Sequence, residues 1–353
     1  MASQLAYKTV LNALYFSGAQ TVSRFWLGGL GGILMLHRVD AAKSRDFAPN
    51  SHLTVSPKFL DRLFLRLKRA GYEFVSMDEA VSRLHAWRPR RWPEPIIAVT
   101  LDDGYRDNLE NAVPVFRKHA IPYTIFVAPG LVEGRATLWW EDLEAVIARR
   151  ERFVMGSPKG RVDFDVSTPA LKRRVYAELL ALLTTRVDED EQRRIVSQLC
   201  MQAGIDAEAH RARSIMNWRE IVELSRDPLC TIGAHTVRHF ALARLESDRA
   251  MAEMEESARI LELETGQRPK HLAYPYGYKE AAGPREFALA REAGFDSAVT
   301  TRHGVLYPEH VGHLHALPRI SLNGHFQAKR YVDTLLSGVP TRLANKGRML
   351  NVG

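Results

Sequence analysis

Short apolar runs alternate with amphipathic segments along most of the chain. The runs that predict β-strands lie at residues 33–36, 74–75, 96–101, 123–127, 230–232, 272–274, 297–299 and 316–320. Helix signals separate these runs: Ser56-Pro57 predicts an N-cap with a first-turn proline, and Gly71 ends that helix. Another helix is predicted over residues 247–264, with Ser247 as its N-cap and Gly266 past its end. Such alternation predicts a parallel α/β barrel or open sheet, with its chemistry at the carboxyl ends of the strands.

The stretch from about residue 139 to residue 217 breaks this alternation. It shows little strand signal, whereas Thr168-Pro169 predicts the start of a helix through Leu183, and residues 188–202 repeat the pattern. We therefore expect a helical insertion over the mouth of the barrel, within a domain that spans residues 31–325.

Both ends of the chain lie outside this domain. Residues 1–30 predict an amphipathic helical segment, and residues 326–353 predict a C-terminal helix with a basic tail. The apolar face of the first segment consists of Tyr7, Val10, Leu11, Leu14 and Tyr15. No stretch reaches the ~20 apolar residues of a membrane span, and polar residues 17–21 interrupt any secretory signal. We expect this segment to pack on the barrel of a cytoplasmic protein, with a peripheral contact at the inner membrane face as the alternative.

Composition agrees with a single globular domain. The chain has 353 residues, of which 46% are hydrophobic and 25% charged, so it can bury a large core. Its formal net charge of +8 would suit an anionic partner, but the basic residues are interspersed with acidic ones and no aromatic-basic motif accompanies them. We therefore expect no nucleic-acid partner. The two cysteines, Cys200 and Cys230, predict buried thiols rather than a disulfide framework.

Two acidic and two basic positions carry the candidate chemistry. Asp102 and Asp103 lie between the apolar run 96–101 and Gly104, and His235 and His239 follow another short apolar run. Adjacent carboxylates at the end of a buried strand are costly to desolvate unless a cation or hydrogen bonds compensate them. Two imidazoles and one carboxylate can hold a divalent metal such as zinc, and the second carboxylate stays free as a general base. The histidines can lie on one helical face or on a loop.

Three motifs carry a resemblance to a known family. Residues 100–105 read Thr-Leu-Asp-Asp-Gly-Tyr, residues 233–239 read Gly-Ala-His-Thr-Val-Arg-His, and residues 273–277 read Ala-Tyr-Pro-Tyr-Gly. In this order they resemble the motifs of the polysaccharide deacetylases, the NodB-like carbohydrate esterases of family 4, over residues 31–322. The resemblance implies a distorted (β/α) barrel of the NodB-homology type with a helical insertion.

The resemblance also implies roles for single residues. It makes Asp103, His235 and His239 metal ligands and Asp102 the catalytic base, with the amide of Tyr276 as a candidate oxyanion donor. We expect the bound metal to be zinc, with cobalt, nickel or manganese as alternatives. Candidate substrate contacts are Tyr105, Pro275, Tyr276, Gly277 and Trp140, the last either stacking on a sugar or belonging to the core.

This chain departs from the family pattern at two places. Many members have an arginine, which braces the catalytic aspartate, where this chain has Ala273. Arg319 is a candidate substitute, and its alternative is an ordinary surface cation. Many members also take the catalytic acid from a Leu-x-His segment, to which residues 313–315 correspond poorly. His37, after an apolar run, resembles the strand-ending Tyr-His of the subgroup that deacetylates poly-N-acetylglucosamine, so we expect His37 to be the acid.

The predicted function is a metal-dependent deacetylase that acts on N-acetylated amino sugars of a polysaccharide, oligosaccharide or glycolipid precursor. The same machinery acting as a deformylase or an O-acetyl esterase on a related sugar is one alternative. A catalytically inactive glycan-binding protein is another, which Ala273 favours and the intact aspartate and histidine motifs oppose.

Overall fold

A closed parallel β-barrel forms the centre of the molecule. The computed structural model describes residues 2–41, 45–87, 94–157 and 160–352. Eight parallel strands are arranged in the order β1-β12-β11-β10-β9-β6-β5-β4, and β1 also pairs with β5. That last pairing closes seven strands into a ring and leaves β4 on the first half of β5. The bounds are β1 (Gly31–Leu36), β4 (Glu73–Val75), β5 (Ile96–Leu101), β6 (Tyr123–Val127), β9 (Cys230–Ala234), β10 (His271–Ala273), β11 (Ser297–His303) and β12 (Leu317–Ser321). The predicted distorted (β/α) barrel is confirmed.

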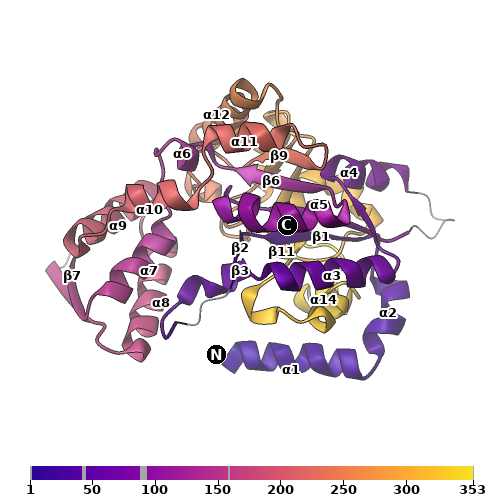
Figure 1. The fold of residues 1–353 in the computed structure, drawn as a ribbon, viewed down its shortest axis with the longest axis horizontal. Helices are drawn as coiled ribbons and strands as arrows, with labels where there is room; N and C mark the ends of the chain where they lie inside the picture. The colour runs from indigo at the N-terminus through magenta and orange to yellow at the C-terminus, as the bar shows by residue number, and fades with distance from the viewer. Residues whose placement is uncertain (1, 42–44, 88–93, 158–159, 353) are drawn as a thin grey trace.

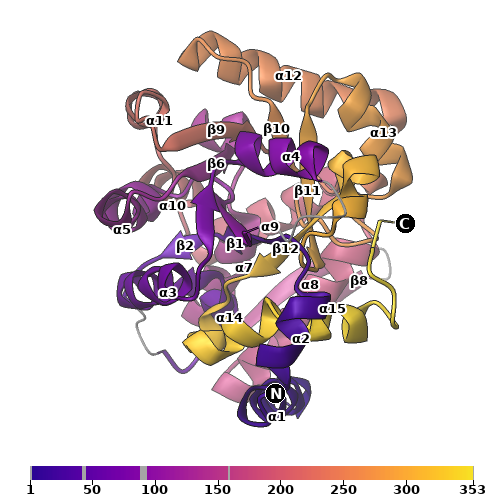
Figure 2. The same cartoon turned by 90° about the vertical axis from the view of Figure 1, so that its right-hand side faces the viewer.

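Helices surround this ring, as Figure 2 shows in a view into the barrel. They are α3 (Pro57–Arg69), α4 (Met77–Ala86), α5 (Val113–His119), α11 (Trp218–Ser225), α12 (Ser247–Thr265), α13 (Pro284–Glu292) and α14 (Lys329–Leu335). The Ser56 hydroxyl accepts a hydrogen bond from the Phe59 amide at 3.2 Å, so the predicted cap of α3 is present. Helix α12 begins one position earlier than expected, with Glu246 rather than Ser247 as its N-cap.

Alternation along β5 determines which side chains enter the barrel. Ile97, Val99 and Leu101 belong to the main core between the strands and the helices. Ile96 and Ala98 belong to a smaller core with interior side chains such as Phe126. Thr100 and Asp102 have the same parity as Ala98, and successive side chains of a strand point to opposite faces. Asp102 is thereby directed toward the barrel interior at the carboxyl end of β5.

The insertion forms a lobe with a hydrophobic core of its own, on the left of Figure 1. It contains α7 (Trp139–Arg149), β7 (Arg152–Ser157), β8 (Gly160–Asp165), α8 (Pro169–Thr185), α9 (Glu189–Ala203) and α10 (Ala207–Ser214). The antiparallel hairpin of β7 and β8 is a correction, because we expected only helices here. The alternation of apolar and polar residues that would predict these two strands is weak in the sequence. Among their described side chains, those that are buried are Phe153, Met155 and Phe164. Phe153 and Phe164 stack with their ring centres 5.1 Å apart.

The remaining elements lie at the chain ends and in the loops. Helices α1 (Ala2–Phe16) and α2 (Ala19–Leu27) pack against α14 and α15 (Val339–Ala344), respectively. The short elements are β2 (Arg38–Val39), β3 (Thr54–Val55), α6 (Pro129–Val132), η1 (Pro49–Leu53), η2 (Asn108–Ala112), η3 (Leu242–Arg244), η4 (Pro308–Ala316) and η5 (Gly324–Phe326). On the predicted apolar face of α1, Leu11 is buried, Leu14 and Tyr15 are half-buried, and Tyr7 and Val10 are exposed. None of the described helices is long and apolar enough to cross a membrane.

Candidate active site

The predicted site residues gather in one cavity at the carboxyl ends of the strands. Its volume is about 590 Å³. Its polar floor contains His37 after β1, the Asp102-Asp103 pair after β5 and the histidine pair after β9. The other lining residues include Asn50, His52, Trp139, Trp140, Tyr176, Leu180, Thr184, Tyr276, Tyr278 and Thr301. Helix α8 of the insertion thus forms a wall of the cavity, which sequence reasoning did not assign to particular residues.

Asp103, His235 and His239 converge on one point. The Oδ1 atom of Asp103 lies 3.3 Å from Nε2 of His235 and 3.2 Å from Nε2 of His239, and all three residues are buried. The Nδ1 atom of His235 lies 2.7 Å from the carbonyl oxygen of Ala273. A proton shared with that carbonyl belongs on Nδ1, so the Nε2 lone pair points toward Asp103.

These three residues fit a divalent metal ion. The buried Oδ1 of Asp103 has no hydrogen-bond partner among the described residues, an arrangement that costs free energy unless a cation compensates it. Burial opposes a charge on His235, but Asp103 and Asp102 outweigh it and raise the pKa of this imidazole. The carboxylates therefore favour positive charge at this point. Burial lowers the pKa of His239 to about 4, which keeps that imidazole neutral as a ligand must be.

The loops that carry these three residues have unusual backbone conformations. Asp103, Thr236, His239 and Tyr276 all have positive φ, at 75°, 57°, 55° and 61°. Non-glycine residues adopt this region rarely, and such strain is retained where the surrounding structure imposes it. The cluster of four around one cavity indicates that the loops are shaped for the site rather than for stability.

The two histidines lie on a loop and not on a helix. The Thr236 hydroxyl accepts a hydrogen bond from the His239 amide at 3.1 Å, which closes the turn between the two histidines. Glu253 of α12 accepts from the amides of Val237 and Arg238 at 2.9 and 2.8 Å. This buried carboxylate fixes the loop from behind, and sequence reasoning missed it because α12 lies outside the three motifs.

Arg319 forms a buried ion pair with Asp102. Its two terminal nitrogens each lie 2.7 Å from one carboxylate oxygen of Asp102. The guanidinium also donates to the Thr300 carbonyl and to the Thr100 hydroxyl, at 2.9 and 3.1 Å. Burial alone would raise the pKa of the Asp102 carboxyl, but Arg319 outweighs this effect and holds it below its usual range. Arg319 is therefore no surface cation, and it comes from β12 into the barrel interior, where Ala273 is also buried.

His37 lies beside this ion pair. Its Nε2 is 3.9 Å from Oδ2 of Asp102, and it lines the cavity. By contrast, His313 and His315 belong to η4, immediately before β12, and His315 lies 2.7 Å from the carbonyl of Phe295, which precedes β11. These two histidines therefore lie at the amino ends of the strands, at the other end of the barrel.

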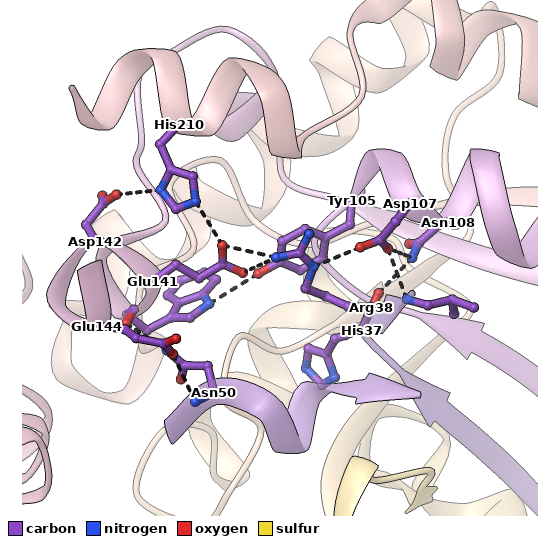
Figure 3. A network of polar contacts seen from close by, with 12 residues as sticks. His37, Arg38, Asn50, Tyr105, Asp107, Asn108, Glu141, Asp142, Glu144 and His210 are labelled. Atoms are coloured by element: carbon purple, nitrogen blue, oxygen red, sulfur yellow. Dashed lines mark hydrogen bonds and ion pairs between the residues drawn. The ribbon is translucent and has the colours of Figure 1, made fainter. Parts of the chain in front are cut away.

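A polar network holds the segment that follows β1, as Figure 3 shows. The side-chain Nδ2 of Asn108 donates to the His37 carbonyl at 2.7 Å, and the Asp107 carboxylate accepts a hydrogen bond from Arg38 at 2.8 Å. Arg38 also contacts Glu141 of α7 at 3.1 Å. The network thus connects the backbone of His37 to the insertion, through contacts that no motif in the sequence indicates.

The network continues to His210 of α10. Its ring nitrogens lie 2.9 Å from Asp142 and 3.2 Å from Glu141. These two carboxylates outweigh burial and raise the pKa of His210 to about 9. His210 is therefore charged at neutral pH and joins α7 to α10.

The candidate substrate contacts divide into three groups. Trp140 and Tyr276 line the cavity, each with its ring centre 4.9 Å from that of His239. Pro275 and Gly277 are buried, and a Cβ at Gly277 would lie 2.5 Å from the Thr301 amide, so this turn shapes the wall through its backbone. Tyr105 does not fit the role we predicted, because its side chain is fully buried.

The contacts of Tyr105 and Tyr276 explain their positions. Tyr105 packs under Arg38 and accepts a hydrogen bond from the Trp140 indole at 3.2 Å. The Tyr276 hydroxyl accepts from the Trp139 indole at 2.9 Å. The backbone amide of Tyr276 has no acceptor within the described part of the chain, as an oxyanion donor requires.

Comparisons with known proteins agree with this geometry. The family model for polysaccharide deacetylase matches residues 90–152 and 180–297, which together make up just over half of the chain. This chain belongs to the polysaccharide deacetylase family. Members of this family are hydrolases that cleave the N-acetyl amide bonds of sugars. The gap between the two matched segments contains most of the β7–β8 hairpin and the first part of α8.

Relatives and solved structures extend the comparison. YxkH of Bacillus subtilis (strain 168), named as a polysaccharide deacetylase, is 30% identical over 95 residues, which span 27% of this chain and 30% of YxkH. The deacetylase PplD of Streptococcus pyogenes, solved in complex with acetate, is 18% identical with a TM-score of 0.56, and the match covers 86% of this chain and 97% of that one. IcaB of Ammonifex degensii is 19% identical with a TM-score of 0.54, over 87% and 97% of the two chains. At these identities the two structures show a shared fold.

Proposed function

We propose that this deacetylase is metal-dependent and removes acetyl groups from N-acetylated amino sugars of a polysaccharide, oligosaccharide or glycolipid precursor. One observation carries the proposal: a buried Asp102–Arg319 ion pair lies directly beside the convergent Asp103, His235 and His239. A structural metal site needs no second, separately held carboxylate. A hydrolytic site does, because attack by water on an amide requires a base.

Asp103, His235 and His239 would hold the metal, with zinc as the first choice and cobalt, nickel or manganese as alternatives. Two imidazoles and a carboxylate suit such ions and leave positions open for water and substrate. The ion would supply a Lewis acid that polarises the acetyl carbonyl and lowers the pKa of the attacking water.

Asp102 acts as the general base. It takes the proton from the water as that water attacks the acetyl carbon, and Arg319 keeps the carboxylate ionised and oriented for this transfer. The peptide N–H of Tyr276 donates a hydrogen bond to the developing oxyanion, and its lack of an acceptor among the described residues supports this assignment.

His37 acts as the general acid and protonates the leaving amine. Its position 3.9 Å from Asp102 and at the cavity wall supports this role over His313 and His315. The proton taken up by Asp102 needs only a short path to the imidazole, so the pair can complete the proton transfer of amide hydrolysis within the cavity.

The cavity walls favour a sugar as substrate. Trp140 and Tyr276 provide aromatic faces of the kind on which sugar rings stack, and the alkyl side chain of Leu180 adds an apolar surface from α8. The structural relative PplD is in complex with acetate, which supports an acetyl group as the part of the substrate that this site hydrolyses.

Release of the carboxylate product, acetate or formate, from a panel of substrates tests the proposal. The purified protein, stripped with a chelator and reloaded with zinc, is offered N-acetylated glucosamine oligosaccharides, matched N-formyl analogues and O-acetylated sugars. We expect the fastest turnover on the N-acetyl substrates and none in the stripped protein. Equal turnover with and without metal would contradict metal dependence, and a preference for formamide or ester would select one of the alternatives.

A further inference from the structure

The outward face of the two N-terminal helices is apolar and exposed. Five large side chains, each 63 to 76% exposed, lie along it: Leu5, Phe16, Val22, Phe25 and Trp26. With Tyr7 and Val10 they make up seven of the fifteen large hydrophobic side chains that are exposed in the described part of the chain. A single exposed apolar residue is ordinary, whereas such a concentration in two helices marks an interaction surface.

The same face is uncharged. Residues 1–30 contain only two charged residues, Lys8 and Arg24. Lys8 lies over the Phe326 ring at 5.4 Å, and Arg24 lies over the Tyr72 ring at 4.7 Å and donates to the Ala70 carbonyl. Both cations are thus directed toward the body of the protein, and the outward positions of α1 and α2 between them are apolar or neutral.

The surroundings of this face are strongly basic. Residues 326–353, which include α14 and α15, the partners of α1 and α2, contain five lysines or arginines and one acidic residue, Asp333. Lys329, Lys346 and Arg348 are exposed. Together with residues 1–30, this end of the protein has a net charge of +6, most of the +8 of the whole chain. Positive charge beside an uncharged apolar face complements an anionic lipid surface.

We propose that the outward face of α1 and α2 docks this protein onto an anionic lipid bilayer. Phe16, Phe25 and Trp26 enter the boundary between headgroups and acyl chains, and the basic residues of α14, α15 and the tail contact the headgroups. The helices lie on the bilayer without crossing it, which agrees with their lengths of 15 and 9 residues.

A chain of contacts leads from this surface to the active-site cavity. Tyr7 of α1 meets Phe326 of η5, with the two ring centres 5.6 Å apart. The neighbouring His325 stacks on His52 at 6.0 Å, and His52 lines the cavity. A protein docked through α1 therefore keeps the η1–η5 rim of its cavity close to the bilayer, where a sugar carried on a lipid would be presented.

Vesicle sedimentation tests the docking, independently of catalysis. The wild-type chain and the double variant Phe16→Ser, Phe25→Ser are mixed with vesicles of phosphatidylglycerol and phosphatidylcholine. Removing two aromatic side chains from the bilayer should lower the partition coefficient by about 10- to 100-fold. The matched control is Met201→Ser, Leu263→Ser, which removes two equally exposed apolar side chains on α9 and α12 and should bind as the wild type does.

A second pair of substitutions tests the contribution of the basic residues to vesicle binding. The double variant Lys346→Glu, Arg348→Glu should lose the preference for phosphatidylglycerol over pure phosphatidylcholine vesicles, and unchanged circular dichroism and melting temperature would show that each variant folds. Equal sedimentation of the wild type and the Phe16→Ser, Phe25→Ser variant would overturn the proposal. A second result would also overturn it: the wild type does not bind vesicles and sediments as a dimer in ultracentrifugation, whereas the variant sediments as a monomer. The face would then join two copies of the chain.

Discussion

Arg319 is the residue whose position most directly affects the proposed base. It is an arginine supplied by β12, and its guanidinium has hydrogen bonds to both oxygens of Asp102. Replacing it with alanine leaves a buried carboxylate unpaired, and such a group becomes easier to protonate.

We therefore expect Arg319→Ala to lower kcat and to shift the acidic limb of the pH–rate profile to higher pH. The base works only when ionised, so a raised pKa removes activity at pH values where the wild type still turns over. Arg319→Lys retains the charge and should recover part of the shift. A profile with an unmoved acidic limb in Arg319→Ala would show that Arg319 has only a structural role.

His37 and His315 can be separated by the choice of substrate. An amine leaves only after protonation, whereas the alcohol of an activated acetate ester leaves readily without it. His37→Ala should cut amide turnover by about 10²- to 10⁴-fold and spare metal content and most of the ester activity. His315→Ala is the matched control and should leave both activities intact; the opposite pattern would transfer the acid role to η4.

The convergence of Asp103, His235 and His239 beside Asp102 could be predicted because each residue lies within a short motif at the end of an apolar run. For Arg319 the sequence left two interpretations open, a partner of Asp102 or a surface cation. Nothing in the local sequence distinguishes an arginine on β12 that points inward from one at the surface. Glu253 and Asn108 could not be predicted, because their contacts with the site loops depend on how separate elements pack. Tyr105 belongs to a motif, but its burial depends on Arg38 and Trp140.

At the scale of elements, the barrel strands could be read from the sequence and the insertion only in part. Parallel strands buried on both faces read as continuous apolar runs, as β5 and β6 do. The β7–β8 hairpin has one buried face with few large side chains, so its alternation was too short to recognise. The helices were recognisable where caps such as Ser56 and Thr168 open them.

His210 gives the junction between α7 and α10 a measurable pH dependence. Its pKa is about 9 in the folded protein and about 6.5 when unfolded. A raised folded pKa means that the stabilisation is complete below about pH 6.5 and is lost as the pH rises through about 9.

The free energy of unfolding should therefore fall by roughly 1–3 kcal/mol more in the wild type than in His210→Gln over this interval. Urea unfolding of both proteins at a series of pH values measures the difference. If the free energy of unfolding depends on pH in the same way in both proteins, His210 does not have the raised pKa that its contacts with Asp142 and Glu141 imply.

At the scale of the whole molecule, the closed barrel explains why distant motifs form one site. Seven parallel strands end at the same rim, so residues after β1, β5, β9 and β10 meet there although they span more than half of the sequence. The insertion adds the α8 wall to the cavity, and α1 and α2 add a surface outside it. The catalytic residues, the wall of the cavity and the proposed docking surface thus belong to different parts of the chain.

The central claim is that Asp103, His235 and His239 hold a metal while the adjacent Asp102 acts on the proton. Metal content and acetate release, measured side by side for the wild type, His239→Ala and Asp102→Asn, test it most directly. We expect His239→Ala to lose most of its metal and its activity, and Asp102→Asn to keep the wild-type metal content while turnover falls by about 10²- to 10⁴-fold. Full metal content in His239→Ala, or wild-type turnover in Asp102→Asn, would contradict the account.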